Sequence, residues 1–182
     1  KPPIYRETEE TKSHHPVELP VMDADGGNRK VLRTIEPVIH SAAWSPDGKT
    51  LAITAATPAK PDEAPQVGLF LLPASGRGEL QLIRLNAWTP SWSPDGRKLA
   101  FTVEYPRGRW RVHTANVNGK GEAAIGNPKV DNGSPAWSPD GHEIAFYQFT
   151  DQGRREQVFV MNADGSNVRQ VTSDSAWSCG GP

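Results

Sequence analysis

The sequence has very little cysteine: Cys179 is its only one, so no disulfide within the chain can hold the fold together. No apolar run approaches the roughly 18–20 residues that a membrane-spanning helix needs. Nor is there a surplus of one charge, because 20 basic residues stand against 21 acidic residues. Nucleic-acid binders typically have a basic surplus, so we expect no nucleic-acid partner and no direct membrane span.

Helical periodicity is also missing, because no segment keeps an apolar repeat of about 3.6 residues for three turns. Instead, 17 glycines and 17 prolines separate short apolar runs. This composition is typical of many short strands joined by tight turns, and it predicts an all-β protein. The 182 residues are enough for one domain with its own core.

A Trp-Ser-Pro-Asp-Gly motif recurs along the chain. Its Trp, Pro, Asp and Gly residues are Trp44, Pro46, Asp47 and Gly48, then Trp92, Pro94, Asp95 and Gly96, then Trp137, Pro139, Asp140 and Gly141. A decayed fourth copy contains Trp177, with Cys179 in the place of proline. The intervals between successive tryptophans are 48, 45 and 40 residues, and a period in the forties is typical of four short strands with their turns.

A second motif repeats out of phase with the first. Met22-Asp23-Ala24-Asp25-Gly26 matches the segment 161–165, with looser copies at 72–76 and 115–119. Each unit then contains four predicted strands. The first ends at the tryptophan, and proline, aspartate and glycine suit the turn that follows it. The second strand places a small alanine between large apolar residues, which suits a sheet covered on both faces.

Such sheets cannot bury both faces alone, so we expect them to stack radially as a β-propeller of about four four-stranded blades, partial or open. A β-sandwich is the alternative, but it does not require nearly identical turns at a fixed period. We expect an N-terminal extension at 1–16, with a possible worn strand, followed by a propeller at 17–182. Its parts are a partial blade at 17–38, blades at 39–86, 87–130 and 131–173, and a terminal strand at 174–182.

These motifs resemble the PD40 repeats of TolB-like propellers over roughly residues 17–181. The resemblance implies a non-catalytic scaffold that binds other protein subunits in the periplasm or outside a bacterial cell. Two alternatives stay open. The chain could be the propeller portion of a tricorn-like or prolyl-oligopeptidase-like serine peptidase whose catalytic domain is absent, or a propeller that binds a small molecule or sugar in its central channel. TolB-like propellers usually have six blades, more than this chain provides.

No catalytic, metal or cofactor site is predicted. A Gly-x-Ser-x-Gly elbow is missing, and the serines of Gly133-Ser134-Pro135 and Gly165-Ser166-Asn167 lie in repeat turns. Asp23, Asp25 and Asn28 imitate a calcium loop, but a hairpin turn is favoured because the segment repeats at Asp164. His14 and His15 lack partners with metal-ligand spacing.

A segment rich in arginine and aromatic residues is the candidate partner surface, since these residue types are favoured at interface hot spots. It joins the second and third strands of one blade, and the same connection of the next blade carries two more arginines. An ordinary charged hairpin tip is the alternative. The candidate residues are Tyr105, Arg107, Arg109, Trp110, Arg111, Arg154 and Arg155.

Two structural expectations complete the interpretation. Trp44, Trp92 and Trp137 should occupy equivalent, largely buried positions at the ends of the innermost strands. Ile4-Tyr5 and Trp177 could close a shared blade, but Pro20 within a third strand favours an open arc, because proline belongs on edge strands.

Overall fold

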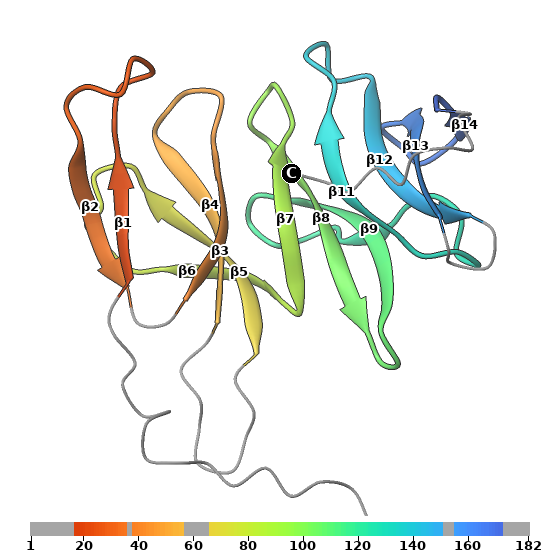
Figure 1. Ribbon diagram of the computed structural model, residues 1–182, viewed down its shortest axis with the longest axis horizontal. Coiled ribbons are helices and arrows are strands. Elements are labelled where there is room, and N and C mark those ends of the chain that lie inside the picture. The colour runs from red at the N-terminus through yellow and green to blue at the C-terminus, as the bar shows by residue number, and fades with distance from the viewer. Residues whose placement is uncertain (1–16, 36–37, 57–65, 151–154, 173–182) are drawn as a thin grey trace, which may run out of the picture.

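The computed structural model describes residues 17–35, 38–56, 66–150 and 155–172. The regular secondary structure in these ranges consists of β-strands alone (Figure 1). The strands form four antiparallel sheets. The half-blade contains β1 (Val17–Val21) and β2 (Lys30–Ile35). The first blade contains β3 (Ile39–Trp44), β4 (Thr50–Ala56), β5 (Val67–Pro73) and β6 (Gln81–Leu85).

The other two sheets also have four strands. The second blade contains β7 (Ala87–Trp92), β8 (Lys98–Tyr105), β9 (Arg109–Asn116) and β10 (Ala123–Ala124). The third blade contains β11 (Asn132–Trp137), β12 (Glu143–Thr150), β13 (Arg155–Asn162) and β14 (Arg169–Gln170). Among the described residues there is no helix that could cross a membrane.

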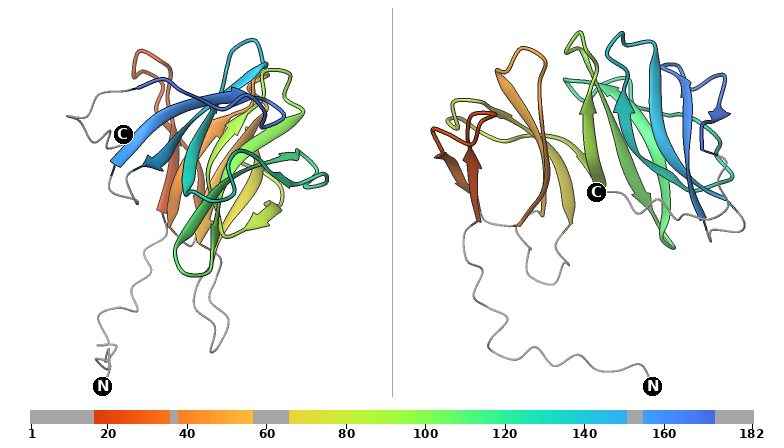
Figure 2. Two further views of the ribbon diagram at one scale, coloured as in Figure 1. Left: turned by 90° about the vertical axis from the view of Figure 1, so that its right-hand side faces the viewer. Right: turned by 45° about the horizontal axis from the view of Figure 1, so that its top comes forward.

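The sheets stand side by side in one row, with the half-blade at one end (Figure 2). Within each four-stranded blade, neighbouring strands follow one another along the chain. The first strands are the innermost ones, because β7 contacts both β3 and β11. The fold is therefore an all-β partial propeller.

The second strand of each blade explains how the blades stack. In β4, Leu51 and Ile53 belong to a cluster that faces the half-blade, whereas Ala52 belongs to the cluster between the first and second blades. In β8, Phe101 packs toward the first blade and Ala100 toward the third. Large residues therefore project to one side of each sheet and a small alanine lets the next blade approach, as the alternation of side chains along a strand requires.

The half-blade supplies the third and fourth strands of the repeat. Its turn has Gly26 at φ 86° and Asn28 at φ 51°, and the turn between the third and fourth strands of the third blade repeats this with Gly165 at φ 87° and Asn167 at φ 54°. Pro20 lies in β1 at a shift of register with β2, a place where proline is tolerated because the ladder is already interrupted.

The three tryptophans occupy equivalent places, but the expectation that all are largely buried is wrong. Trp92 packs on the first blade and Trp137 on the second, and both are half-buried. Trp44 is 50 % exposed. Since each tryptophan packs on the preceding blade, Trp44 faces a half-blade whose described strands are only the outer pair. The residues Ile4, Tyr5 and Trp177, on which the question of closure depends, lie outside the described residues.

The inner strands β7 and β11 each contain a backbone irregularity, and a proline comes directly after it in the sequence. Thr89 and Ser134 each have φ 47° and sit where β7 and β11 shift register against their partners. Thr89 Oγ1 and Thr102 Oγ1 are 2.8 Å apart, and the backbone N–H of Ser134 donates to Thr102 Oγ1 over 2.9 Å. Thr102 is 2 % exposed, and it joins the second and third blades at their inner edge.

Candidate interaction surfaces

The Ser-Pro-Asp-Gly turns share one hydrogen-bond pattern. After β7, Ser93 Oγ donates to Oδ1 of Asp95 over 2.6 Å and accepts a bond from the backbone N–H of Lys98 over 2.9 Å. The same Oδ1 accepts the backbone N–H of Arg97 over 3.0 Å, and Gly96 leaves the turn at φ 68°. The equivalent turns of the first and third blades repeat these bonds. The polar groups of the turn thus hydrogen-bond to one another, and this structural role accounts for the repetition of the motif.

This bonding keeps the turn carboxylates charged. The pKa of Asp47, Asp95 and Asp140 is lowered in each case, first because a serine hydroxyl donates to the carboxylate and second because a backbone N–H does so. Hydrogen bonds to the charged form favour that form. All three aspartates are exposed, so they place negative charge on the rim formed by these turns.

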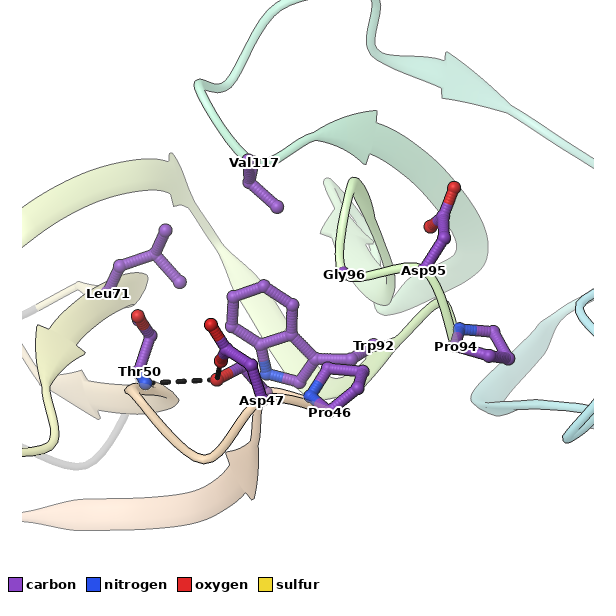
Figure 3. A pocket seen from close by; sticks show the side chains of 10 residues that line it. Pro46, Asp47, Thr50, Leu71, Trp92, Pro94, Asp95, Gly96 and Val117 are labelled. Atoms are coloured by element: carbon purple, nitrogen blue, oxygen red, sulfur yellow. Dashed lines mark hydrogen bonds between the residues drawn. The ribbon is translucent and has the colours of Figure 1, made fainter.

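Two pockets lie between consecutive turns on this rim. One has a volume of about 440 Å³ and lies between the first and second blades, with Trp92 at its base (Figure 3). The other has a volume of about 540 Å³ and lies between the second and third blades, beside Trp137. Both are open to solvent and recur because the repeat recurs.

The arginine-rich segment is a hairpin between β8 and β9 at the opposite end of the blades (Figure 1). Arg107 and Gly108 form its tip, with φ 69° and 67°, and both are exposed. Arg109 is held to the connection that enters the third blade, because its Nε lies 2.6 Å from Oδ1 of Asp131. A second arm of the guanidinium donates to the carbonyl of Lys129 over 3.2 Å.

Aromatic rings continue from the base of this hairpin across two blades. The ring of Trp110 meets that of Trp88 edge-on, with centroids 5.9 Å apart, and the His40 ring lies 4.9 Å from Trp88 on the other side. The backbone N–H of Trp110 donates to Asp131 Oδ1 over 3.1 Å, which fixes the start of β9. His40 is exposed and both tryptophans are half-buried. We call His40, Trp88, Arg107, Arg109 and Trp110 the aromatic-arginine surface.

The other predicted residues of the hairpin belong to a polar chain. The Arg111 guanidinium lies 5.4 Å from the centre of the Tyr105 ring, and Tyr105 Oη is 2.9 Å from His113 Nε2. His113 Nδ1 is 2.8 Å from Oε1 of Glu122, which also pairs with Arg84 Nε of the first blade at 3.1 Å. Burial lowers the pKa of His113, and the neighbouring Glu122 only partly opposes this. Tyr105 and Arg111 thus contribute to contacts within and between blades.

Of the remaining two predicted residues, the structure describes one, and it lies in another blade. Arg155 is exposed at the start of β13 in the third blade. Arg154 lies outside the described residues. The hairpin therefore brings together five of the seven predicted residues, those from Tyr105 to Arg111.

Trp88 and His40 were not predicted from the sequence. Each stands four residues before a motif tryptophan, at the same place in its inner strand, so the repeat contained a positional signal. The third blade has Gly133 there, and a position that holds histidine, tryptophan and glycine gives no pattern of residue type. The contribution of these two residues to the surface becomes visible only in the structure, where the inner strands lie side by side.

The calcium-like segment is a hairpin turn. Asn28 Nδ2 donates to Oδ2 of Asp23 over 2.6 Å, and the backbone N–H of Gly27 donates to Oδ1 of Asp25 over 2.8 Å. These bonds are those of an Asx-type turn.

The two serines considered as possible nucleophiles form hydrogen bonds that stabilise the blades and their turns. The backbone N–H of Ser134 bonds to Thr102, and Ser166 Oγ donates to Oδ1 of Asp164 over 2.6 Å. His14, His15 and Cys179 lie outside the described residues.

Comparison with solved structures supports the same architecture. TolB from Acinetobacter baumannii matches with a TM-score of 0.69 and 22 % identity, over 88 % of this chain and 38 % of that one. The β-propeller domain of the Trilobed protease from Pyrococcus furiosus matches with a TM-score of 0.59 and 14 % identity, over 76 % of this chain and 43 % of that one. A prolyl endopeptidase matches with a TM-score of 0.58 and 18 % identity, over 89 % of this chain and 27 % of that one.

The chain therefore spans less than half the length of each of these proteins, and at these identities the likeness describes the fold alone. A family model matches nearly the whole sequence: the TolB β-propeller domain, PD40, matches residues 4–180. Together with the repeated turns and the stacked four-stranded blades, this match shows that the chain belongs to the PD40 family of TolB β-propeller domains.

Proposed function

We propose that this chain is a non-catalytic propeller segment that binds another protein through the aromatic-arginine surface. The observation that carries the proposal is the continuous contact from His40 through Trp88 to Trp110, beside Arg107 at the exposed tip of the hairpin. Aromatic residues and arginine are enriched among the residues that contribute most to protein–protein binding.

The geometry favours a preorganised surface over a loose charged tip. Asp131 fixes both the Arg109 side chain and the backbone of Trp110. Groups held before binding lose less conformational freedom when a partner arrives, which raises affinity. The indole Nε1 of Trp88 is buried without a hydrogen-bond partner among the described residues.

Photo-crosslinking in the native host tests the proposal. A crosslinker at position 107 should yield a discrete protein adduct, and the same crosslinker at position 77 should not, because Arg77 is an exposed arginine of the β5–β6 turn, on the opposite rim. Charge reversal by Arg107→Glu should weaken the interaction with the captured protein at least tenfold, and Arg77→Glu should leave it unchanged. Equal adducts at both positions would refute a specific surface.

The family resemblance also motivates a proposal for location, which is the periplasm or the exterior of a bacterial cell. Fractionation of the native host tests this directly.

The rival function is the propeller portion of a serine peptidase, since propellers of a protease and a prolyl endopeptidase share the fold. A serine-hydrolase probe should not label the full-length product of the native gene, whereas labelling of a catalytic domain in that same product would favour the rival.

A further inference from the structure

The pocket between the first and second blades has the chemistry of a cation site. It lies on the rim of the Ser-Pro-Asp-Gly turns, away from the aromatic-arginine surface. The volume of about 440 Å³ falls in the range of small-ligand sites. The residues that line it are Ser45, Pro46, Asp47, Thr50, Leu71, Trp92, Pro94, Asp95, Gly96 and Val117.

One wall is an immobilised indole. Trp92 Nε1 donates to the backbone carbonyl of Ala43 over 3.1 Å, and the ring packs against the hydrophobic cluster of the first two blades. Leu71 and Val117 lie above the indole, and Pro46 lies alongside it (Figure 3). A fixed aromatic face beside aliphatic groups suits an alkyl chain that ends in a positive charge.

Two carboxylates line the pocket. Asp47 lies beside the Trp92 ring, whereas Asp95 stands on the next turn with its carboxylate pointing away from that ring (Figure 3). Each turn uses Oδ1 of its aspartate, and among the described residues nothing donates to either Oδ2. The lowered pKa of both groups keeps them ionised at neutral pH. The pocket therefore presents two acceptors and negative charge.

The neighbouring pocket differs at one informative position. Lys98 lines the pocket between the second and third blades, together with His142. Thr50 occupies the place of Lys98 in the first blade, because both begin the second strand after the turn. A lysine lines one pocket, whereas neither lysine nor arginine lines the other, although the two share Pro94 and Asp95. Lys49 and Arg97 are exposed and do not line the first pocket.

We propose that the pocket at Trp92 binds an alkylammonium group, presented by a lysine side chain of an extended peptide. The alkyl stem lies on the indole beside Leu71 and Val117, and the ammonium donates to Oδ2 of Asp47. The binding site is independent of the aromatic-arginine surface, and its ligand has the opposite charge to the partner that arginines would recruit.

Titration followed by NMR tests the proposal with the full chain. The Trp92 indole N–H signal, assigned by its loss in Trp92→Phe, should shift saturably with acetyl-trilysine-amide, whereas the norleucine analogue should cause no saturable shift. Removing one charged contact should weaken binding by about fivefold or more, so Asp47→Asn should show that loss. Asparagine keeps the Oδ1 acceptor of the turn, so this variant should fold normally.

Matched variants locate the effect. Asp140→Asn makes the same change in a turn outside this pocket and should bind like the parent, and so should Arg107→Glu. Thr50→Lys should abolish binding, and Lys98→Thr should create a second binding event at the Trp137 indole. Absence of a saturable shift, or equal binding by Asp47→Asn, would overturn the proposal. Binding of n-butylamine without binding of the peptide would also overturn it, by assigning the pocket to a free amine.

Discussion

The indole Nε1 of Trp92 donates a hydrogen bond to the carbonyl oxygen of Ala43, 3.1 Å away in the preceding blade. The residue that defines the repeat therefore joins two repeats. Ala43 precedes Trp44 at the end of β3, so the bond connects equivalent ends of two inner strands. This relationship leads to a first prediction about the tryptophans.

Truncation should have different costs at equivalent tryptophans. Trp92→Ala removes a half-buried ring and its bond to Ala43, and we expect a loss of about 3 kcal/mol in the free energy of unfolding. Trp44→Ala should cost less than about 1 kcal/mol, since half of the Trp44 surface is already exposed. Urea unfolding measures both values. Equal losses would mean that Trp44 is covered in solution.

The serine of each turn should control the acidity of its aspartate. Ser93→Ala removes the main hydrogen bond to Asp95, so the Asp95 pKa should rise toward its ordinary value of 3.8. Because the folded-state pKa is lowered, the contribution to stability is present above the unfolded-state pKa and disappears as the pH falls through the folded-state pKa. Carboxyl ¹³C titration measures the change. Ser138→Ala is the control, since it should alter Asp140 alone.

His113 should make the protein less stable in mild acid. Its folded-state pKa lies below the ordinary 6.5, so the unfolded chain takes up its proton at the higher pH. The free energy of unfolding should fall as the pH drops from about 6.5 to the folded-state pKa, with a slope of at most about 1.4 kcal/mol per pH unit from this group. Replacing His113 by glutamine should flatten the profile in that window. An unchanged slope would assign the effect to other groups.

Two turn glycines allow the cost of a left-handed backbone to be measured apart from the cost of a steric clash. Gly76 and Gly26 both have positive φ, 72° and 86°, at equivalent turn positions. A Cβ on Gly76 would collide with the backbone carbonyl of Leu32 in the half-blade, whereas one on Gly26 would meet nothing within 4 Å. Gly26→Ala should therefore cost about 1 kcal/mol for the left-handed backbone alone. Gly76→Ala should cost measurably more, because β2 must also move, and similar costs in thermal unfolding would contradict this.

Much of the fold could be predicted because its information is local. Proline, aspartate and glycine specify the turns wherever they occur, and the alanine between two large residues of β4 or β8 records that both faces of the sheet are covered. The burial of Trp44 could not be predicted in this way. Its neighbours in sequence match those of Trp92 and Trp137, and its exposure depends on what precedes its blade in space.

The candidate surface was predictable only in part, for a similar reason. The hairpin from Tyr105 to Arg111 is contiguous, so its composition is visible in the sequence. His40 and Trp88 lie 70 and 22 residues before Trp110, and only the stacking of β3, β7 and β9 brings the rings together. The positive φ of Thr89 was also hidden, since a β-branched residue rarely adopts it.

The bond from Trp92 to Ala43 gives the row of blades a direction. At each junction between two four-stranded blades the motif tryptophan of the later blade is the donor and the earlier blade supplies the acceptor: the indole N–H of Trp92 donates to the Ala43 carbonyl, and the backbone N–H of Trp137 donates to Ser91 Oγ. The two ends of the row are therefore chemically unlike. A gene that gains or loses one whole repeat keeps the remaining junctions intact. The length of propellers of this type is therefore free to vary in steps of one blade.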